Sequence, residues 1–144
     1  MQTMKQEISA GAVIYKIENN KILYLIEYMS LGHISLAKGH LENNESLSEG
    51  AIREIKEETS LDVLLDINFE HIITYSPYEG IIKDVHYFVA KVIDNSALAI
   101  DKHDNEVIKI KFKEYRDAIN LLTYESDKET LFLANKYIIN KEGL

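Results

Sequence analysis

Three glutamates, Glu54, Glu57 and Glu58, lie close together in the segment EGAIREIKEETSL. On a helix, Glu54 and Glu58 lie one turn apart and Glu57 lies on the adjoining arc, so the three carboxylates converge. Like charges at these spacings repel one another, and Arg53 offsets only part of that repulsion. The spacing therefore indicates that a cation binds among them.

The loop before this segment suggests which cation. Lys38, Gly39 and His40 directly precede the acidic stretch, and a glycine lets backbone carbonyl groups approach a ligand closely. Magnesium prefers carboxylate and carbonyl oxygens and commonly holds phosphate oxygens in its remaining positions. A solvated acidic face is the competing interpretation, because helices with interleaved acidic and basic residues are common on surfaces. The loop favours a metal and polyphosphate site.

The bulk properties of the chain predict one soluble, cytoplasmic domain, residues 1–144. Hydrophobic residues make up 46% and charged residues 28%, which is a globular composition. The net charge of −8 argues against DNA or an anionic membrane as a partner, since these usually bind a basic face. Without cysteine there are no disulfides and no thiol nucleophile. No apolar run is long enough for a membrane span or a signal peptide.

Strands dominate the first two thirds of the chain. The segments EISAGAVIYKI and KILYLIEYM, separated by ENN, predict a hairpin. Residues 30–44 predict a loop, because they contain two glycines and show no periodicity. After the acidic segment, LDVLLDINFEHIITYS and IKDVHYFVAKVI predict a second antiparallel pair.

The remaining segments decide the class of fold. EVIKIKFKE alternates with period two as a short strand does, and apolar spacings of three and four in EYRDAINLL and DKETLFLANKYIIN predict two closing helices. Only one helix is then expected between strands. This order favours a mixed sheet with helices packed on it over a doubly wound parallel sheet.

The acidic segment has the features of a helix start. Ser46 can cap the helix, and Glu49 three residues later completes a capping box. At about 100° per residue, Glu54 and Glu58 border an apolar stripe, which places carboxylates at the edge of a buried face. The residues of that stripe are Leu47, Ala51, Ile52 and Ile55.

These residues resemble the signature of the Nudix hydrolases, the MutT-like pyrophosphohydrolases. Gly39, five residues, Glu45, seven residues and then REIKEETSL match the family pattern over residues 39–61 at every fixed position except one. Ser60 stands where the family has a glycine that ends the helix in a left-handed turn. A serine costs about 1 kcal/mol there, and since serine is not a metal ligand, the departure is interpreted as a structural variation.

The resemblance extends over most of the chain and, within the family, is to the asymmetric diadenosine tetraphosphate hydrolases. The segments SAGAVIYK, KGH, KDVHYFVA and LLTYESDK carry it. It implies an α/β (α+β) Nudix fold, in which an α/β/α sandwich surrounds a central mixed β-sheet. It also implies that water attacks phosphorus and that diadenosine tetraphosphate yields ATP and AMP. The adenine-contacting surface could differ, because HISLAKGH lacks the prolines and the aromatic residue of the relatives and Phe112 replaces a usual tryptophan.

The resemblance also implies roles for the acidic helix. Glu54, Glu57 and Glu58 would hold one to three Mg²⁺ (or Mn²⁺) ions, with the backbone carbonyl of Lys38 as a further ligand. Metal ions in such sites polarise phosphoryl oxygens and activate water. Either Glu54 or Glu57 would take the proton of the attacking water, and Arg53 would orient a helix carboxylate through a bidentate ion pair.

Two further acids and a histidine complete this expected set. Glu45 is expected to brace the junction between loop and helix. Glu106 aligns with a late-loop glutamate of the relatives and is either an additional metal ligand or base, or a solvated loop acid. His103 in the same loop could contact phosphate, although nothing in the sequence requires it.

The expected substrate-binding residues lie in the loop and on a later strand. His33, Lys38 and Lys83 suit the stabilisation of polyphosphate charge, and Gly39 lets the loop approach the ligand. The alternative for Lys83 is a solvated lysine at a strand end. Tyr87 either stacks on a base, as the KDVHYF resemblance suggests, or packs in the sheet, as aromatic residues in strands usually do.

The leading prediction is therefore a metal-dependent pyrophosphohydrolase whose partner is a small-molecule nucleotide polyphosphate, most simply diadenosine tetraphosphate. Hydrolysis of RNA 5′ ends, (d)NTPs or another pyrophosphate is the alternative within the family, and a nucleotide sensor without turnover is the alternative outside catalysis. A sensor has no need of the metal carboxylates, and all of them are present here, which favours an enzyme. A monomer and a homodimer are both open.

Overall fold

The backbone of residues 4–93 and 106–144, described by a computed structural model, forms one mixed sheet with helices on both faces. His103 lies outside these residues. The strands are β1 (Lys5–Glu18), β2 (Lys21–Met29), β3 (Ile34–Ser35), β4 (Ala37–His40), β5 (Val63–Tyr75), β6 (Ile81–Val92) and β7 (Val107–Glu114). The helices are α1 (Leu47–Thr59), α2 (Tyr115–Leu121) and α3 (Glu125–Glu142).

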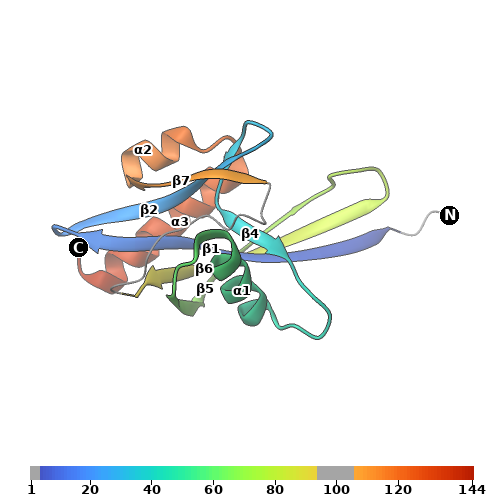
Figure 1. Ribbon diagram of the computed structural model, residues 1–144, viewed down its shortest axis with the longest axis horizontal. Coiled ribbons are helices and arrows are strands. Elements are labelled where there is room, and N and C mark those ends of the chain that lie inside the picture. The colour runs from blue at the N-terminus through green and yellow to red at the C-terminus, as the bar shows by residue number, and fades with distance from the viewer. Residues whose placement is uncertain (1–3, 94–105) are drawn as a thin grey trace.

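Strand β1 is the long central strand of the sheet, drawn in dark blue in Figure 1. On one side it pairs in parallel with β6, and β5 follows β6 at that edge. On its other side β1 pairs antiparallel with β4 over Ser9–Ala12 and with β2 over Tyr15–Glu18. Beyond this short overlap β2 pairs with β3, and the opposite edge of β2 pairs with β7 over Leu23–Met29. The predicted mixed sheet is confirmed, and β2 and β4 occupy different parts of the same side of β1.

The hairpin between β1 and β2 forms at the predicted place. Asn19 and Asn20 make the two-residue turn, with φ angles of 52° and 62°. Positive φ at both central positions is what a type I′ turn requires, and asparagine tolerates this region better than most residues do. The local sequence is therefore sufficient to specify this hairpin.

The prediction of an uninterrupted loop over residues 30–44 is wrong. Two short strands, β3 and β4, form within it. Their pairing partners are β2 and β1, which come earlier in the chain. Strand formation here depends on those partners and not on local periodicity, which explains why the sequence pattern gave no sign of it.

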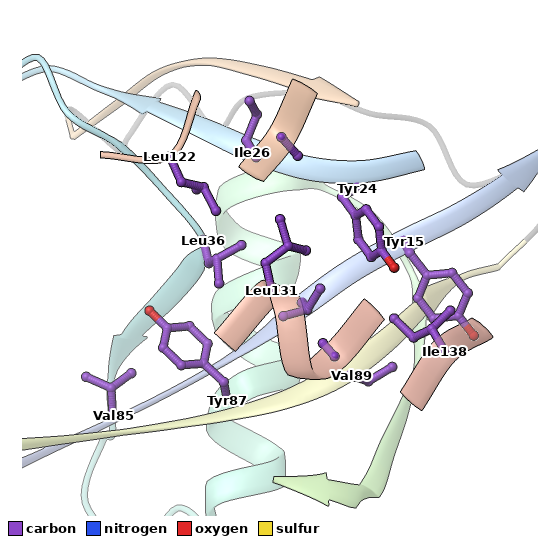
Figure 2. Packing of buried hydrophobic residues seen from close by; sticks show 13 residues of the cluster. Tyr15, Tyr24, Ile26, Leu36, Val85, Tyr87, Val89, Leu122, Leu131 and Ile138 are labelled. Carbon is purple, nitrogen blue, oxygen red and sulfur yellow. The ribbon is translucent and has the colours of Figure 1, made fainter. Parts of the chain in front are cut away.

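Two buried clusters, one on each face, hold the layers together. The cluster in Figure 2 joins the sheet to α2 and α3 and includes Tyr15, Tyr24, Ile26, Leu36, Tyr87, Val89, Leu122, Leu131 and Ile138. The cluster on the other face joins the sheet to α1 and includes Ile14, Leu25, Ala51, Ile55, Leu61, Phe88 and Ile110. The result is the expected α/β/α sandwich. Within the described residues, no helix is long and apolar enough to cross a membrane.

Helix α1 begins as predicted, and one residue of its apolar stripe lies outside the core. The hydroxyl of Ser46 accepts a hydrogen bond from the main-chain N–H of Glu49, whose carboxylate accepts one from the N–H of Ser46, both at 3.1 Å. Ala51 and Ile55 are fully buried, but Ile52 is 46% exposed. Ile52 lies at the margin of the predicted stripe, and the sheet does not extend far enough to cover it.

Helix α1 ends at Ser60 in the left-handed conformation. The φ and ψ angles of Ser60 are 63° and 5°, and its N–H donates to the carbonyl of Lys56. A Cβ atom is unfavourable in this region, which is why glycine is the usual residue at such a position.

Replacing Ser60 by glycine should therefore stabilise the protein by about 1 kcal/mol, after the greater flexibility of glycine in the unfolded chain is allowed for. The measurement is urea unfolding followed by circular dichroism. Ser60→Ala is the matched control, because it removes the hydroxyl and keeps Cβ. A glycine variant no more stable than the alanine variant would contradict the conformational explanation.

Candidate active site

The guanidinium group of Arg53 joins the loop to helix α1. It makes a bidentate ion pair with Glu45, with Nε–Oε2 at 2.7 Å and Nη2–Oε1 at 3.0 Å, and Nη2 donates to the carbonyl of His40 at 2.9 Å. Its Nη1 contacts Glu54 Oε1 at 3.0 Å and Glu57 Oε2 at 3.1 Å. The hydrogen bonds that Arg53 donates to Glu45 raise the pKa of Arg53 above its ordinary value. Arg53 thus orients two helix carboxylates, and Glu45 braces the junction.

Gly39 lets strand β4 lie directly against the carboxylate of Glu54. A Cβ atom built on Gly39 would be 2.0 Å from Cδ of Glu54, well inside any permitted contact. The side chain of Glu54 is only 16% exposed, so it has little room to move aside. The requirement for glycine at position 39 is therefore steric, and it places a carboxylate beside the backbone that follows Lys38.

The three helix glutamates differ in exposure. Glu58 is 6% exposed and lies at the buried face, whereas the side chain of Glu57 is 51% exposed. Among the described residues, no group of three or more histidine, aspartate or glutamate side chains is arranged to hold a metal ion. Arg53 contacts two of the three helix carboxylates, those of Glu54 and Glu57. Because Glu57 is exposed, its carboxylate can turn away from Arg53 without disturbing the core.

A first pocket, with a volume of about 290 Å³, lies beside Lys38, Gly39 and His40 of β4. It brings together the predicted residues His33, Lys38, Gly39, Lys83 and Glu106. Three of these five side chains are basic or can become so, in a chain of net charge −8. Glu106 is held here through its carbonyl, which accepts a hydrogen bond from the N–H of Ser30 at 2.6 Å. Lys38 and Lys83 give the first pocket two cations for an anionic ligand, beside the acids Glu27 and Glu106.

A second pocket, of about 420 Å³, shares His33, Ser35 and Lys38 with the first. Its other lining residues include the partly exposed rings of Tyr75 and Tyr124. The His33 and Tyr124 rings lie 5.6 Å apart, and Nζ of Lys38 lies 5.6 Å from the centre of the Tyr75 ring. Exposed aromatic rings beside a cationic pocket can stack on a planar ligand.

Tyr87 is not in either pocket, and the prediction that it stacks on a base is wrong for this structure. Its side chain is fully buried in the cluster of Figure 2, between the sheet and α3. Val85 and Val89 flank it on the same face of β6 and are also fully buried. The packing interpretation of this strand tyrosine is the correct one.

Two tyrosines and two acids are among the pocket residues that the sequence did not predict. Tyr75 is the last residue of β5 and Tyr124 is the N-cap of α3, so each lies at the end of an element, where a ring can remain exposed. Glu27 and Asp127 are buried acids, at 1% and 4% exposure, lining the first and second pocket respectively. The sequence signals were the charge of Glu27 within the apolar run KILYLIEYM and the segment LLTYESDK, which contains Tyr124 and Asp127.

Comparisons with known proteins agree with this geometry. A model of the NUDIX domain matches residues 5–134. The chain belongs to the Nudix hydrolase family. The C. elegans Ap4A hydrolase, solved as a binary complex, is 26% identical, with a TM-score of 0.83 over 93% of this chain and 98% of its own.

Two other Nudix structures show likeness of fold alone. The NUDIX domain of Shewanella oneidensis NrtR, complexed with ADP ribose, is 15% identical, with a TM-score of 0.74 over 96% of this chain and 90% of its own. The E. coli dihydroneopterin triphosphate pyrophosphohydrolase is 19% identical, with a TM-score of 0.70 over 96% and 99%. The Nudix fold thus carries different ligands in its different members.

Nudix hydrolases generally use divalent metal ions. The carboxylate oxygens of α1 and the main-chain oxygens of β4 are the hard donors that such ions prefer. The residues of this Nudix box therefore fit a divalent cation by their chemistry.

The ion pair between Glu45 and Arg53 should make stability depend on pH. Arg53 holds the pKa of Glu45 below its ordinary value of 4.5 through hydrogen bonds, so this contribution to stability is complete above pH 4.5 and disappears as the pH falls through the lower pKa of the folded state. Glu45→Gln should therefore be less stable than the wild type at pH 7, and the difference should shrink below pH 4.5.

Urea unfolding between pH 7 and pH 3 measures this difference. Glu79→Gln, in the exposed turn before β6, is the control for the loss of one negative charge. A difference between Glu45→Gln and the wild type that stays constant down to pH 3 would show that the pair with Arg53 contributes nothing.

Proposed function

We propose that the protein is a divalent-cation-dependent pyrophosphohydrolase that cleaves diadenosine tetraphosphate to ATP and AMP. The observation that carries this proposal is the pair of adjoining pockets, one lined by two lysines and one by aromatic rings, with His33, Ser35 and Lys38 as their common wall. In a nucleotide polyphosphate, the phosphate chain would lie in the first pocket and the base in the second. The similarity to the C. elegans Ap4A hydrolase supports the choice of substrate.

The proposed metal ligands are carboxylates of α1 and oxygens near them. Glu54, Glu57 and Glu58 would hold Mg²⁺ or Mn²⁺, with the carbonyl of Lys38 and the carboxylate of Glu106 as further ligands. When bound, such an ion supplies a Lewis acid that polarises the phosphoryl group and makes water more acidic. Glu57 is the exposed member of the set and can leave Arg53 to take part in binding.

The protein's own groups account for the remaining steps. Lys38 and Lys83 in the first pocket neutralise charge on the phosphate chain, and His33 donates a hydrogen bond to it. Glu54 or Glu57 would accept the proton of the attacking water. Glu54 lies against Gly39, which lines the first pocket. Arg53 acts as a positioning residue, because its five N–H donors are directed to Glu45, Glu54, Glu57 and the carbonyl of His40.

The test of this function is the identity of the products. Purified protein with magnesium is incubated with diadenosine polyphosphates, dNTPs, nucleotide sugars and triphosphorylated RNA in oxygen-18 water, and the products are separated and weighed by mass spectrometry. Diadenosine tetraphosphate should give ATP and AMP, with the label in only one of them. Two molecules of ADP, or preferred turnover of another substrate, would refute the proposal.

Glu57→Gln tests the proposed metal ligand Glu57 in the same assay. It removes a charge with little change of shape, and turnover should fall by about a hundredfold or more, as expected for the loss of one group that stabilises the transition state. Folding should be retained, since Glu57 is exposed. Activity that survives this substitution at saturating magnesium would remove Glu57 from the proposed ligands.

The aromatic pocket yields a second prediction. Loss of a ring that stacks on a base costs roughly 1–3 kcal/mol, so Tyr124→Ala should lower kcat/KM for diadenosine tetraphosphate by about ten- to a hundredfold. Tyr78, which is 72% exposed and lines neither pocket, provides the matched control in Tyr78→Ala. The cleaved bond should be the same in all variants.

Tyr87→Ala separates stacking from packing in this experiment. Because Tyr87 is buried in the core, its truncation should cost about 3–5 kcal/mol of stability, as large core truncations do.

Equal kcat/KM values for Tyr124→Ala and Tyr78→Ala would show that the second pocket does not hold the base.

A further inference from the structure

Asp127 places an acidic group in the wall of the aromatic second pocket. It lies in the first turn of α3, beside Tyr124 and Ser126 of the same pocket. Only 4% of the residue is exposed, so its carboxylate has very little contact with bulk water. Burying an acid is unfavourable unless hydrogen-bond donors or cations surround it. The donors and cations around Asp127 therefore indicate whether its carboxylate can accept a further hydrogen bond.

Within the part of the chain that the structure describes, two protein donors reach this carboxylate. The hydroxyl of Tyr87 donates to Oδ1 over a long 3.4 Å, and the main-chain N–H of Leu36 also forms a hydrogen bond with the carboxylate. A carboxylate has about four acceptor positions. These two donors leave acceptor capacity on a group that lines the pocket.

The charge of Asp127 is partly balanced from the opposite wall. Burial raises the pKa of Asp127, while the charges of Lys38 and His33 act to lower it. Both protonation states of a carboxyl group keep an acceptor oxygen. A ligand in the second pocket thus meets an acceptor in either state, next to rings on which a planar group can stack.

We propose that Asp127 is a specificity-determining residue whose carboxylate accepts a hydrogen bond from the exocyclic amino group of a purine bound in the second pocket. The inference rests on the proposed function, which puts a nucleobase there. Stacking on Tyr75 or Tyr124 is tolerant of base identity, since every base has a π-face. Asp127 supplies the element that distinguishes adenine from a purine without the amino group.

The test compares ATP with purine riboside 5′-triphosphate, which differs from ATP only by the absence of the 6-amino group. Binding to the full chain is measured by calorimetry in EDTA, so that no hydrolysis is needed. Wild-type protein should bind ATP about ten- to a hundredfold more tightly, as expected for a hydrogen bond to a charged group. Equal affinities, or no binding of either nucleotide, would overturn the proposal.

Asp127→Leu removes the acceptor and keeps the branched shape of the side chain, and the ratio of the two affinities should fall close to one. Asp117→Leu, at an exposed aspartate in the first turn of α2, is the matched control and should keep the wild-type ratio. A ratio that Asp127→Leu leaves unchanged would assign the amino group to another residue. If Asp127→Leu does not fold, Asp127→Ala, which removes the acceptor without adding volume, takes its place in the same comparison.

The outcome of this binding experiment can be distinguished from the outcome of the product assay that tests the proposed function. A preference for ATP that depends on Asp127, in a protein that does not cleave diadenosine tetraphosphate, would support the specificity role and refute the substrate. Cleavage to ATP and AMP without any preference for the amino group would do the reverse.

Discussion

The geometry of the site depends on the hydrogen bonds and ion pairs made by the guanidinium group of Arg53. This group binds an acid of the loop, two acids of the helix and a carbonyl at the end of β4, all within 3.1 Å. A lysine could not replace it, because only a planar group with five donors serves these acceptors together. Gly39 has no Cβ atom and so leaves room for the carboxylate of Glu54 beside β4. Loop and helix are therefore positioned as one unit.

The pockets exist because the sheet does not continue evenly on that side of β1. Strand β4 pairs with Ser9–Ala12 of β1, whereas β2 pairs with β1 only over Tyr15–Glu18. Lys38 lies on this short strand β4 and lines both pockets. In the proposed complex, its one charge would contact both the phosphate chain and the base end of the ligand.

Features set by neighbouring residues could be predicted from the sequence, and features set by distant partners could not. The Asn19-Asn20 turn, the capping box at Ser46 and the acidic pattern of α1 are local, and the structure has each of them. The strands β3 and β4 need partners from elsewhere in the chain. Tyr87 could not be placed because β6 is buried on both faces along Tyr87–Ala90, so its pattern does not show which side meets a ligand.

The parallel pairing of β1 with β6 also constrains the order in which the protein can fold during synthesis. Lys5 pairs opposite Ile81 and Tyr15 opposite Lys91, so one edge of β1 stays uncovered until the chain through β6 is made. Pairings between segments so far apart in sequence form slowly, and an open strand edge is prone to join other chains. Lys38 and Lys83 line one pocket only after that pairing, so the first pocket is completed late in folding.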